Sequence, residues 1–146
     1  MNDTIKNALI VLDRDFSKAG IDYCIIGGMA MWPYNCERST IDIDTIVSRE
    51  TAPRLREMTK LGYLWDPDYP RSLKMLTDRA PIMIDVLIEG FSIEGVETPS
   101  PVETRRRING IWFISIDKLI DLKSRSSRSR DQRDAEMLAK SDFYWM

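Results

Sequence analysis

The sequence predicts a small mixed β-sheet flanked by helices, a fold of the α+β or mixed α/β class. Short runs rich in β-branched residues alternate with stretches whose apolar residues recur at helical spacing, and glycine or Asn-Gly dipeptides separate several of them. The chain of 146 residues has the length of one compact domain and shows no internal repeat. We therefore expect residues 1–146 to form a single domain.

The first part of the chain predicts a helix, a strand and a short second helix. Apolar residues recur at helical spacing from residue 4 to about residue 18, where Gly20 supplies a stop. Residues 23–26 form a β-prone run that ends at Gly27-Gly28. Residues 29–32 then have a helical pattern up to Pro33. The local order is strand, glycine turn, helix.

The middle of the chain predicts three more strands and a helix. Residues 41–47 are rich in β-branched side chains and indicate a strand, after which Ser48 or Thr51 can cap a helix to about residue 60. Residues 61–70 contain aromatic residues and proline, so we expect irregular structure with a short extended piece. Residues 72–77 and 82–88 indicate two strands joined by a turn at 78–81.

The last part predicts a hairpin followed by two helices. Asn109-Gly110 lies between the β-prone residues 107–108 and 111–114, and this dipeptide suits a two-residue type I′ turn. Ser115 can cap a helix over residues 116–124, and a final helix is expected from residue 131 to about residue 140. We expect Asp131 and Asp134 to cap that helix and to pair within it.

The composition excludes several kinds of site. The chain has no histidine, which rules out Ser/His/Asp and Cys/His triads and His-ligated metals. Cys24 and Cys36 offer neither a disulfide framework nor zinc-site spacing. No apolar stretch approaches the roughly 20 residues of a membrane span, and the N-terminus is too charged for a secretory signal, so we expect a cytoplasmic protein. Catalysis would need carboxylates, Lys, Arg, Tyr, Ser or bound metal.

Basic residues are concentrated in the last third of the chain, where they could face phosphates. A solvated loop and helix face is an equally good interpretation of this stretch. Specific RNA or DNA recognition is not favoured, because no aromatic residue is interleaved and the net charge is −2. The basic residues are Arg105, Arg106, Arg107, Lys118, Lys123, Arg125, Arg128, Arg130 and Arg133.

Three aspartates within predicted strands are the main candidates for chemistry. Residues two apart on a strand point to the same face, so Asp42 and Asp44 would project their carboxylates side by side. Such a pair persists if one carboxyl group is protonated or if a cation such as Mg²⁺ lies between them. Asp85 is another isolated charge in an apolar strand, where an unpaired carboxylate would be costly. The three could converge on two metal ions, Mg²⁺ or Mn²⁺.

Gly27-Gly28 is a candidate phosphate site. The dipeptide lies between a strand and a helix start, where backbone without side chains lets a phosphate approach the exposed N–H groups. A glycine turn beside metal-binding carboxylates suggests a nucleoside triphosphate as substrate.

These motifs resemble a known superfamily. Gly27-Gly28, then Asp42-x-Asp44 and later the lone Asp85 resemble the signature of the DNA polymerase β-like nucleotidyltransferases. More narrowly, "GGMAMWPYNCERSTIDIDTIV" is similar to small bacterial and phage nucleotidyltransferases of the abortive-infection toxin type. The segment "SIDKLIDLKSRSSRSRDQRDAEML" resembles their Leu-x-x-Leu-Lys helix followed by an Arg-Asp-x-x-Asp helix.

The resemblance implies a mixed sheet flanked by helices and transfer of a nucleoside monophosphate from a triphosphate to a hydroxyl group. It implies that Asp42 and Asp44 hold metal, and that Asp85 binds the metal that activates the acceptor hydroxyl. By the same resemblance, the glycines cradle the β- and γ-phosphates. Arg38 and Lys123 would neutralise the triphosphate, and Thr40 would orient the strand or a phosphate.

Two departures from the family pattern leave alternatives open. Met29 follows the glycines where many members have serine, and the larger relatives carry an additional helical domain that holds base or acceptor. The acceptor, whether protein, tRNA or a small molecule, could therefore need a second subunit or a partner protein. One alternative is a non-catalytic protein of this fold that binds a nucleotide or a partner, for example in a toxin and antitoxin pair. Another is a structural module whose aspartates face water or pair with Arg38 or Arg79.

Overall fold

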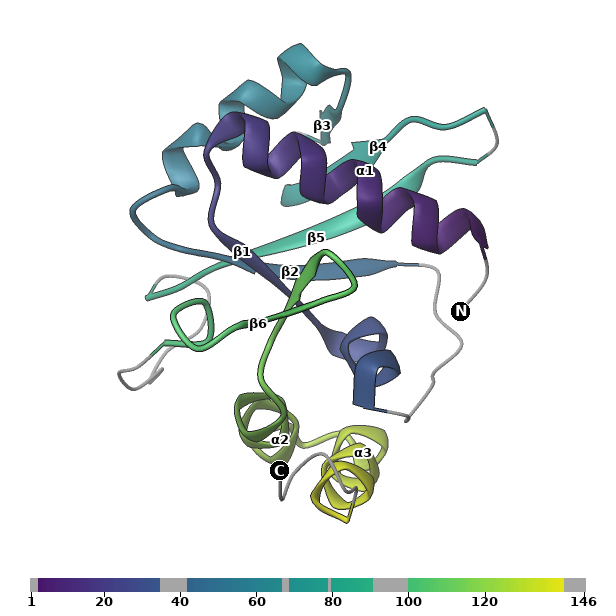
Figure 1. Ribbon diagram of the computed structural model, residues 1–146, viewed down its shortest axis with the longest axis vertical. Helices are drawn as coiled ribbons and strands as arrows, with labels where there is room; N and C mark the ends of the chain where they lie inside the picture. Colours follow the sequence, from purple (N-terminus) through teal and green to yellow (C-terminus); the bar gives the residue numbers. More distant parts are fainter. Residues whose placement is uncertain (1–2, 35–41, 67–68, 79, 91–99, 141–146) are drawn as a thin grey trace.

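The structure, a computed structural model, describes residues 3–34, 42–66, 69–78, 80–90 and 100–140. Within these residues, helices and strands alternate in the first part of the chain, five strands then follow in succession, and two helices come last (Figure 1). Two of the helices, named η below, have the tighter 3₁₀ form. In chain order the elements are α1 (Asp3–Ala19), β1 (Tyr23–Ile26), η1 (Gly27–Tyr34), β2 (Ile43–Val47), η2 (Ala52–Leu61), β3 (Leu64–Asp66), β4 (Tyr69–Met75), β5 (Ile82–Ile88), β6 (Arg106–Ile108), β7 (Ile111–Phe113), α2 (Ile116–Ser124) and α3 (Ser129–Ala139).

The strands of the described residues form one mixed sheet in the order β3-β4-β5-β2-β1-β7-β6. β2 pairs in parallel with β5, and β1 pairs in parallel with β7, while the remaining neighbours are antiparallel. Parallel pairing places β2 beside β5 although η2, β3 and β4 separate them in sequence. The expected mixed sheet flanked by helices is confirmed.

The two faces of the sheet differ. α1 lies across one face, where its Leu12 and Phe16 are completely buried, and each such side chain contributes about 1.5–3 kcal/mol by leaving water (Figure 1). On β5, Ile84 is fully buried while Asp85 is exposed, because successive side chains of a strand point to opposite faces. Asp85 therefore lies on the face turned away from α1.

α2 and α3 pack against each other beside one end of the sheet, at the bottom of Figure 1. α2 also contacts η1, the helix that follows β1. Among the described residues, no helix combines the length and hydrophobicity needed to cross a membrane.

Several predicted elements are confirmed. The strands at 23–26 and 82–88 and the helix at 116–124 have the predicted bounds, and α1 is one residue longer at each end than predicted. The hairpin of β6 and β7 also forms. Asn109 and Gly110 both have positive φ, 51° and 81°, as a type I′ turn requires.

Other predictions were wrong in detail. Residues 61–70 were expected to be irregular apart from a short extended piece, but they contain β3 and the beginning of β4. The pairing of β3 with β4 orders this segment, and local propensity does not reveal such pairing. The glycines form the first residues of η1 and not a turn before it. Ser115 precedes α2 as predicted, but its side chain makes no capping bond. Thr51 makes no capping bond at η2 either, and its hydroxyl accepts the backbone N–H of Asp22 at 3.0 Å. Of the two predicted caps, Ser48 accepts a backbone N–H, that of Thr51, at 3.3 Å.

Candidate active site

A row of polar side chains crosses the face of the sheet turned away from α1. In the strand register, Ser72 of β4 lies opposite Asp85 of β5, and Asp85 lies opposite Asp44 of β2. The Ser72 hydroxyl donates a hydrogen bond to Oδ1 of Asp85 at 2.9 Å. Side chains from three separate segments of the sequence therefore meet on one line across the sheet.

The carboxyl group of Asp44 resists ionisation. Burial is the largest cause, followed by the charge of Asp85, a hydrogen bond between the two carboxyl groups and the charge of Asp42. Together they raise the pKa of Asp44 to about 6, although Lys123 acts in the opposite direction. A divalent cation would relieve the repulsion between Asp44 and Asp85. The pair fits Mg²⁺, which takes one or two carboxylates together with water and phosphate oxygens.

Asp42 occupies a different position from the predicted one. It is exposed and lies just before β2, which begins at Ile43 where the pairing with Ile84 starts. Within the described part of the chain, no three carboxylate or thiol side chains are close enough together to hold one ion. The structure thus joins Asp44 and Asp85, while Asp42 lies near enough to influence the pKa of Asp44.

The lack of a side chain at Gly27 leaves room for the carboxylate of Asp44. Its φ is +68°, and a Cβ atom built on Gly27 would overlap Oδ2 of Asp44. Real Cβ atoms essentially never come this close to another atom, so any side chain at Gly27 would displace the carboxylate. The glycine that the sequence assigned to phosphate binding therefore also has a steric role toward the acidic pair.

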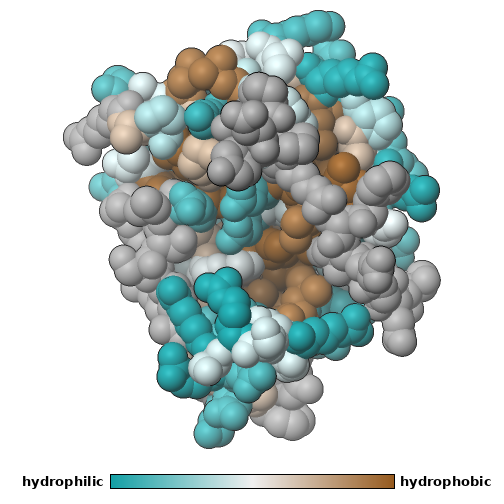
Figure 2. Space-filling model, turned by 180° about the vertical axis from the view of Figure 1, so that it is seen from behind, coloured by the Kyte–Doolittle hydropathy of each residue, from teal (hydrophilic) through white to brown (hydrophobic). Residues whose placement is uncertain are grey.

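Gly27, Gly28 and Asp44 line a cavity of about 530 Å³ between the end of β1 and the α2–α3 pair. Figure 2 shows the face turned away from α1, with hydrophobic side chains at its centre and hydrophilic ones below, at the end where α2 and α3 lie. Asp85 does not line the cavity itself, but it lies opposite Asp44, which does. The other lining residues are Ile26, Asp42, Leu87, Leu119, Leu122, Lys123, Arg128, Arg130, Asp131 and Asp134.

Lys123 lies in this cavity as part of a buried ion pair. Its Nζ is 3.0 Å from Oδ2 of Asp134 and 3.6 Å from Oδ1 of Asp131, and the Lys123 and Asp134 side chains are 8% and 2% exposed. Asp131 and Asp134 were expected to cap α3 and to pair within it. Both instead form ion pairs with Lys123 of α2. Asp131 additionally accepts a hydrogen bond from Ser126. Burial opposes ionisation of Asp131, but that bond, Lys123 and Arg128 outweigh it and lower its pKa.

The remaining predicted residues cannot be placed. Arg38 and Thr40 lie outside the described residues, as does Arg79, which the structural alternative would pair with an aspartate. Their assignments stay predictions.

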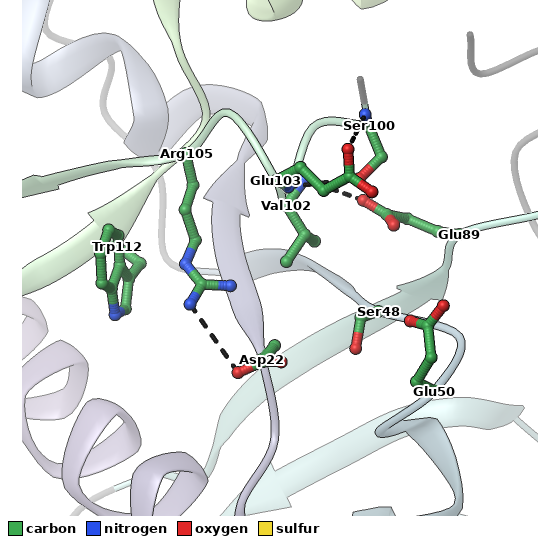
Figure 3. A pocket seen from close by; sticks show the side chains of 9 residues that line it. All are labelled: Asp22, Ser48, Glu50, Glu89, Ser100, Val102, Glu103, Arg105 and Trp112. Carbon is green, nitrogen blue, oxygen red and sulfur yellow. Dashed lines mark hydrogen bonds and ion pairs between the residues drawn. The ribbon is translucent and has the colours of Figure 1, made fainter. Parts of the chain in front are cut away.

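A second cavity, of about 380 Å³, lies at the other end of the strands and contains none of the predicted site residues (Figure 3). Among the described residues that line it, Arg105 is the single basic side chain; its guanidinium stacks on Trp112 at 4.3 Å from the ring centroid and lies 3.7 Å from Asp22. The first cavity has three basic side chains beside its four carboxylates and therefore suits a triphosphate better. The second cavity also has four carboxylates. They belong to Asp22, Glu50, Glu89 and Glu103.

Three side chains at the site were not assigned from the sequence. Ser72 carries no local signal, because its contact with Asp85 exists only through the register of β4 and β5. Arg128 and Arg130 were noted as part of the basic tail, and the structure places both on the cavity wall. The clustering of arginines after Lys123 was the only signal available for them.

The chain was compared with known families, curated proteins and solved structures. Neither a family model nor a curated protein matches it. Among solved structures, an antigenic nucleotidyltransferase-like protein from Paracoccidioides brasiliensis aligns with a TM-score of 0.69 and 17% identity over 94% of this chain and 76% of that one.

The antibiotic-resistance factor ANT(2″)-Ia also aligns with this chain. Its solution structure has a TM-score of 0.60 and 15% identity, covering 94% of this chain and 84% of that one. Its crystal structure in complex with adenylyl-2″-tobramycin has a TM-score of 0.57 and 14% identity, covering 92% and 86%. At these identities the likeness concerns the fold, and the chain has the nucleotidyltransferase fold.

Proposed function

We propose that this protein is a metal-dependent nucleotidyltransferase that transfers a nucleoside monophosphate from a triphosphate to a hydroxyl acceptor. The observation that supports this most directly is the in-register pair of Asp44 and Asp85 on adjacent parallel strands, with the pKa of Asp44 raised to about 6. Two carboxylates that repel each other beside a cavity with basic side chains form a donor set suited to a metal-bound triphosphate.

The residues around the cavity would have different roles in binding the metal and the triphosphate. Asp44 and Asp85 would hold the metal, with Asp42 close by, and Gly27 and Gly28 offer backbone against which the phosphates can lie. Arg128 and Arg130 line the same cavity and can neutralise phosphate charge. Bound Mg²⁺ would polarise the phosphoryl oxygens and lower the pKa of the attacking hydroxyl.

The proposal also concerns the chemical class of the hydroxyl acceptor. Protein, tRNA and small molecules all carry suitable hydroxyl groups. The structural likeness to ANT(2″)-Ia, whose crystal structure contains adenylyl-2″-tobramycin, supports a small-molecule acceptor. The sequence resemblance to abortive-infection toxin-type nucleotidyltransferases supports a macromolecular one, in which case a partner chain would help to bind it.

Calorimetric titration with each nucleoside triphosphate and Mg²⁺ tests the proposal. We expect one nucleotide to bind in a metal-dependent manner, and we expect an Asp42→Asn/Asp44→Asn variant to lose that binding. Glu89→Gln is the matched control, because Glu89 is a partly buried carboxylate with a raised pKa in the second cavity. Equal nucleotide binding by the wild type and the double variant would contradict the proposed site.

A second candidate is a non-catalytic protein of the same fold that binds a nucleotide or a partner. The buried Lys123–Asp134 pair favours it, because a lysine engaged by an aspartate is less available to a triphosphate. In that case calorimetry would still detect the nucleotide, but mixtures with hydroxyl acceptors would release no pyrophosphate.

A further inference from the structure

The strongest feature outside the residues assigned so far is Ser72. Its side chain lies on β4, directly opposite Asp85, and only 7% of the residue is exposed. Asp85 itself is an exposed residue, so packing alone restricts its carboxylate little. The 2.9 Å hydrogen bond from the Ser72 hydroxyl to Oδ1 is therefore a specific restraint on that carboxylate.

We propose that Ser72 is a positioning residue that holds the carboxylate of Asp85 in the orientation in which it shares a metal ion with Asp44. This inference rests on the proposed function, because it assumes that Asp44 and Asp85 bind a cation together. Ser72 would touch neither the metal nor the substrate. It acts through Asp85, in the way that outer-shell hydrogen bonds orient metal ligands in other proteins.

Among the described residues, Ser72 is the hydroxyl that donates to the carboxylate of Asp85. Ser72 is buried, so packing limits the positions its hydroxyl can take. The bond engages one oxygen of Asp85, which leaves the other for Asp44 or a cation. Thr45 also donates to Asp85, at 3.1 Å, but to the main-chain carbonyl oxygen.

Thr45 therefore provides a matched control. Both Ser72→Ala and Thr45→Val remove a buried hydroxyl that bonds to Asp85 from an adjacent strand. Only Ser72→Ala removes a bond to the carboxylate. If Ser72 merely helped the strands to pair, the two substitutions would have similar effects on the site.

The test is a titration of each purified variant with MnCl₂, in which free Mn²⁺ is measured by electron paramagnetic resonance. We expect Ser72→Ala to bind Mn²⁺ about 10-fold more weakly than the wild type, as is usual when an outer-shell partner of a ligand is lost. Thr45→Val should bind within about 2-fold of the wild type. Ser72→Thr keeps the hydroxyl and should restore most of the affinity.

Thermal denaturation shows whether each variant is folded. If Ser72→Ala does not fold, Ser72→Cys replaces it, since a thiol is nearly the same size and only a weak donor, and the same loss is expected. Unchanged Mn²⁺ affinity in folded Ser72→Ala or Ser72→Cys overturns the positioning role while leaving the proposed function intact. A wild-type protein that binds no Mn²⁺ overturns the proposed function and this role with it.

Discussion

In the folded protein the charged form of Asp44 is poorly solvated and lies next to Asp85. The free energy of unfolding therefore depends on pH. The pKa of Asp44 rises from 3.8 in the unfolded reference to about 6. Between these values the folded protein binds more protons at Asp44 than the unfolded chain does, so stability falls as the pH rises. The stabilising effect of protonation is complete below about pH 4 and lost above about pH 6.

We therefore expect Asp44→Asn, which removes this titration, to stabilise the protein at pH 7 relative to the wild type and to have little effect at pH 4. The difference should be on the order of 2 kcal/mol at pH 7, after a reduction for the partial solvent exposure of Asp44. Urea unfolding of both proteins in metal-free buffer from pH 4 to pH 7 measures it. If the difference in unfolding free energy between the two proteins does not change with pH, folding does not raise the pKa of Asp44.

Gly27 leads to a second prediction at the scale of one residue. A methyl group at Gly27 would collide with Oδ2 of Asp44, and its φ of +68° is unfavourable for alanine. We expect Gly27→Ala to lose about 1–2 kcal/mol of stability and at least 10-fold in Mn²⁺ affinity. Chemical denaturation and the same Mn²⁺ titration provide the two measurements.

Gly62 is the control for backbone strain. Its φ is +94°, and nothing lies within 4 Å of a Cβ atom built there. Gly62→Ala should therefore be destabilised to a similar degree while its Mn²⁺ affinity stays that of the wild type. Equal losses of affinity in both variants would mean that backbone strain, and not contact with Asp44, explains the effect.

At the scale of elements, the contact between α2 and α3 includes the buried ion pair of Lys123 and Asp134. Removing one partner of a buried ion pair leaves an uncompensated charge and costs about 3–5 kcal/mol. We expect Lys123→Met to be destabilised by this amount in urea unfolding, because Asp134 is only 2% exposed. A Lys123→Met/Asp134→Leu double variant should recover most of the loss.

The exposed pair of Arg125 and Asp121 on α2 offers the comparison. These side chains are 48% and 52% exposed at a separation of 3.1 Å, so Arg125→Met should cost no more than about 0.5 kcal/mol. If Lys123→Met costs as little as Arg125→Met, the contact of α2 with α3 does not depend on Lys123.

The elements that the sequence predicted well are those with strong local signals. Asn109-Gly110 specified its hairpin because a type I′ turn needs positive φ at both positions. The run from Ile82 to Ile88 specified β5 through its β-branched and apolar residues. β3 was expected only as a short extended piece without bounds, because three residues on the sheet edge carry little pattern of their own and their pairing with β4 supplies the order.

At the scale of the whole molecule, strand order determines which residues meet. The sequence identified Asp44 and Asp85 as candidates, but only the parallel register of β2 and β5 places them opposite each other. The contact of Ser72 with Asp85 and the reach of Asp134 to Lys123 also depend on pairing between distant segments. Local patterns therefore singled out Asp44 and Asp85 as candidates, whereas the contacts of Ser72 with Asp85 and of Asp134 with Lys123 became visible only in the tertiary structure.

The two cavities at the ends of the sheet differ in their basic side chains. Among the described residues, Lys123, Arg128 and Arg130 line the cavity beside Asp44 and only Arg105 lines the second, while four carboxylates line each. A triphosphate with Mg²⁺ should therefore bind at one end only, and binding to the folded state raises its stability by mass action.

At a nucleotide concentration of about 100 times the dissociation constant, the gain is about 2.7 kcal/mol, which corresponds to a rise on the order of 10 °C in the thermal midpoint of a chain this size. Differential scanning calorimetry with and without the bound nucleotide and Mg²⁺ measures that rise. Asp44→Asn should remove most of it and Glu89→Gln should keep it, because Glu89 lies in the second cavity. A rise that survives Asp44→Asn but disappears in Glu89→Gln would place the nucleotide at the wrong end of the sheet for the proposed chemistry.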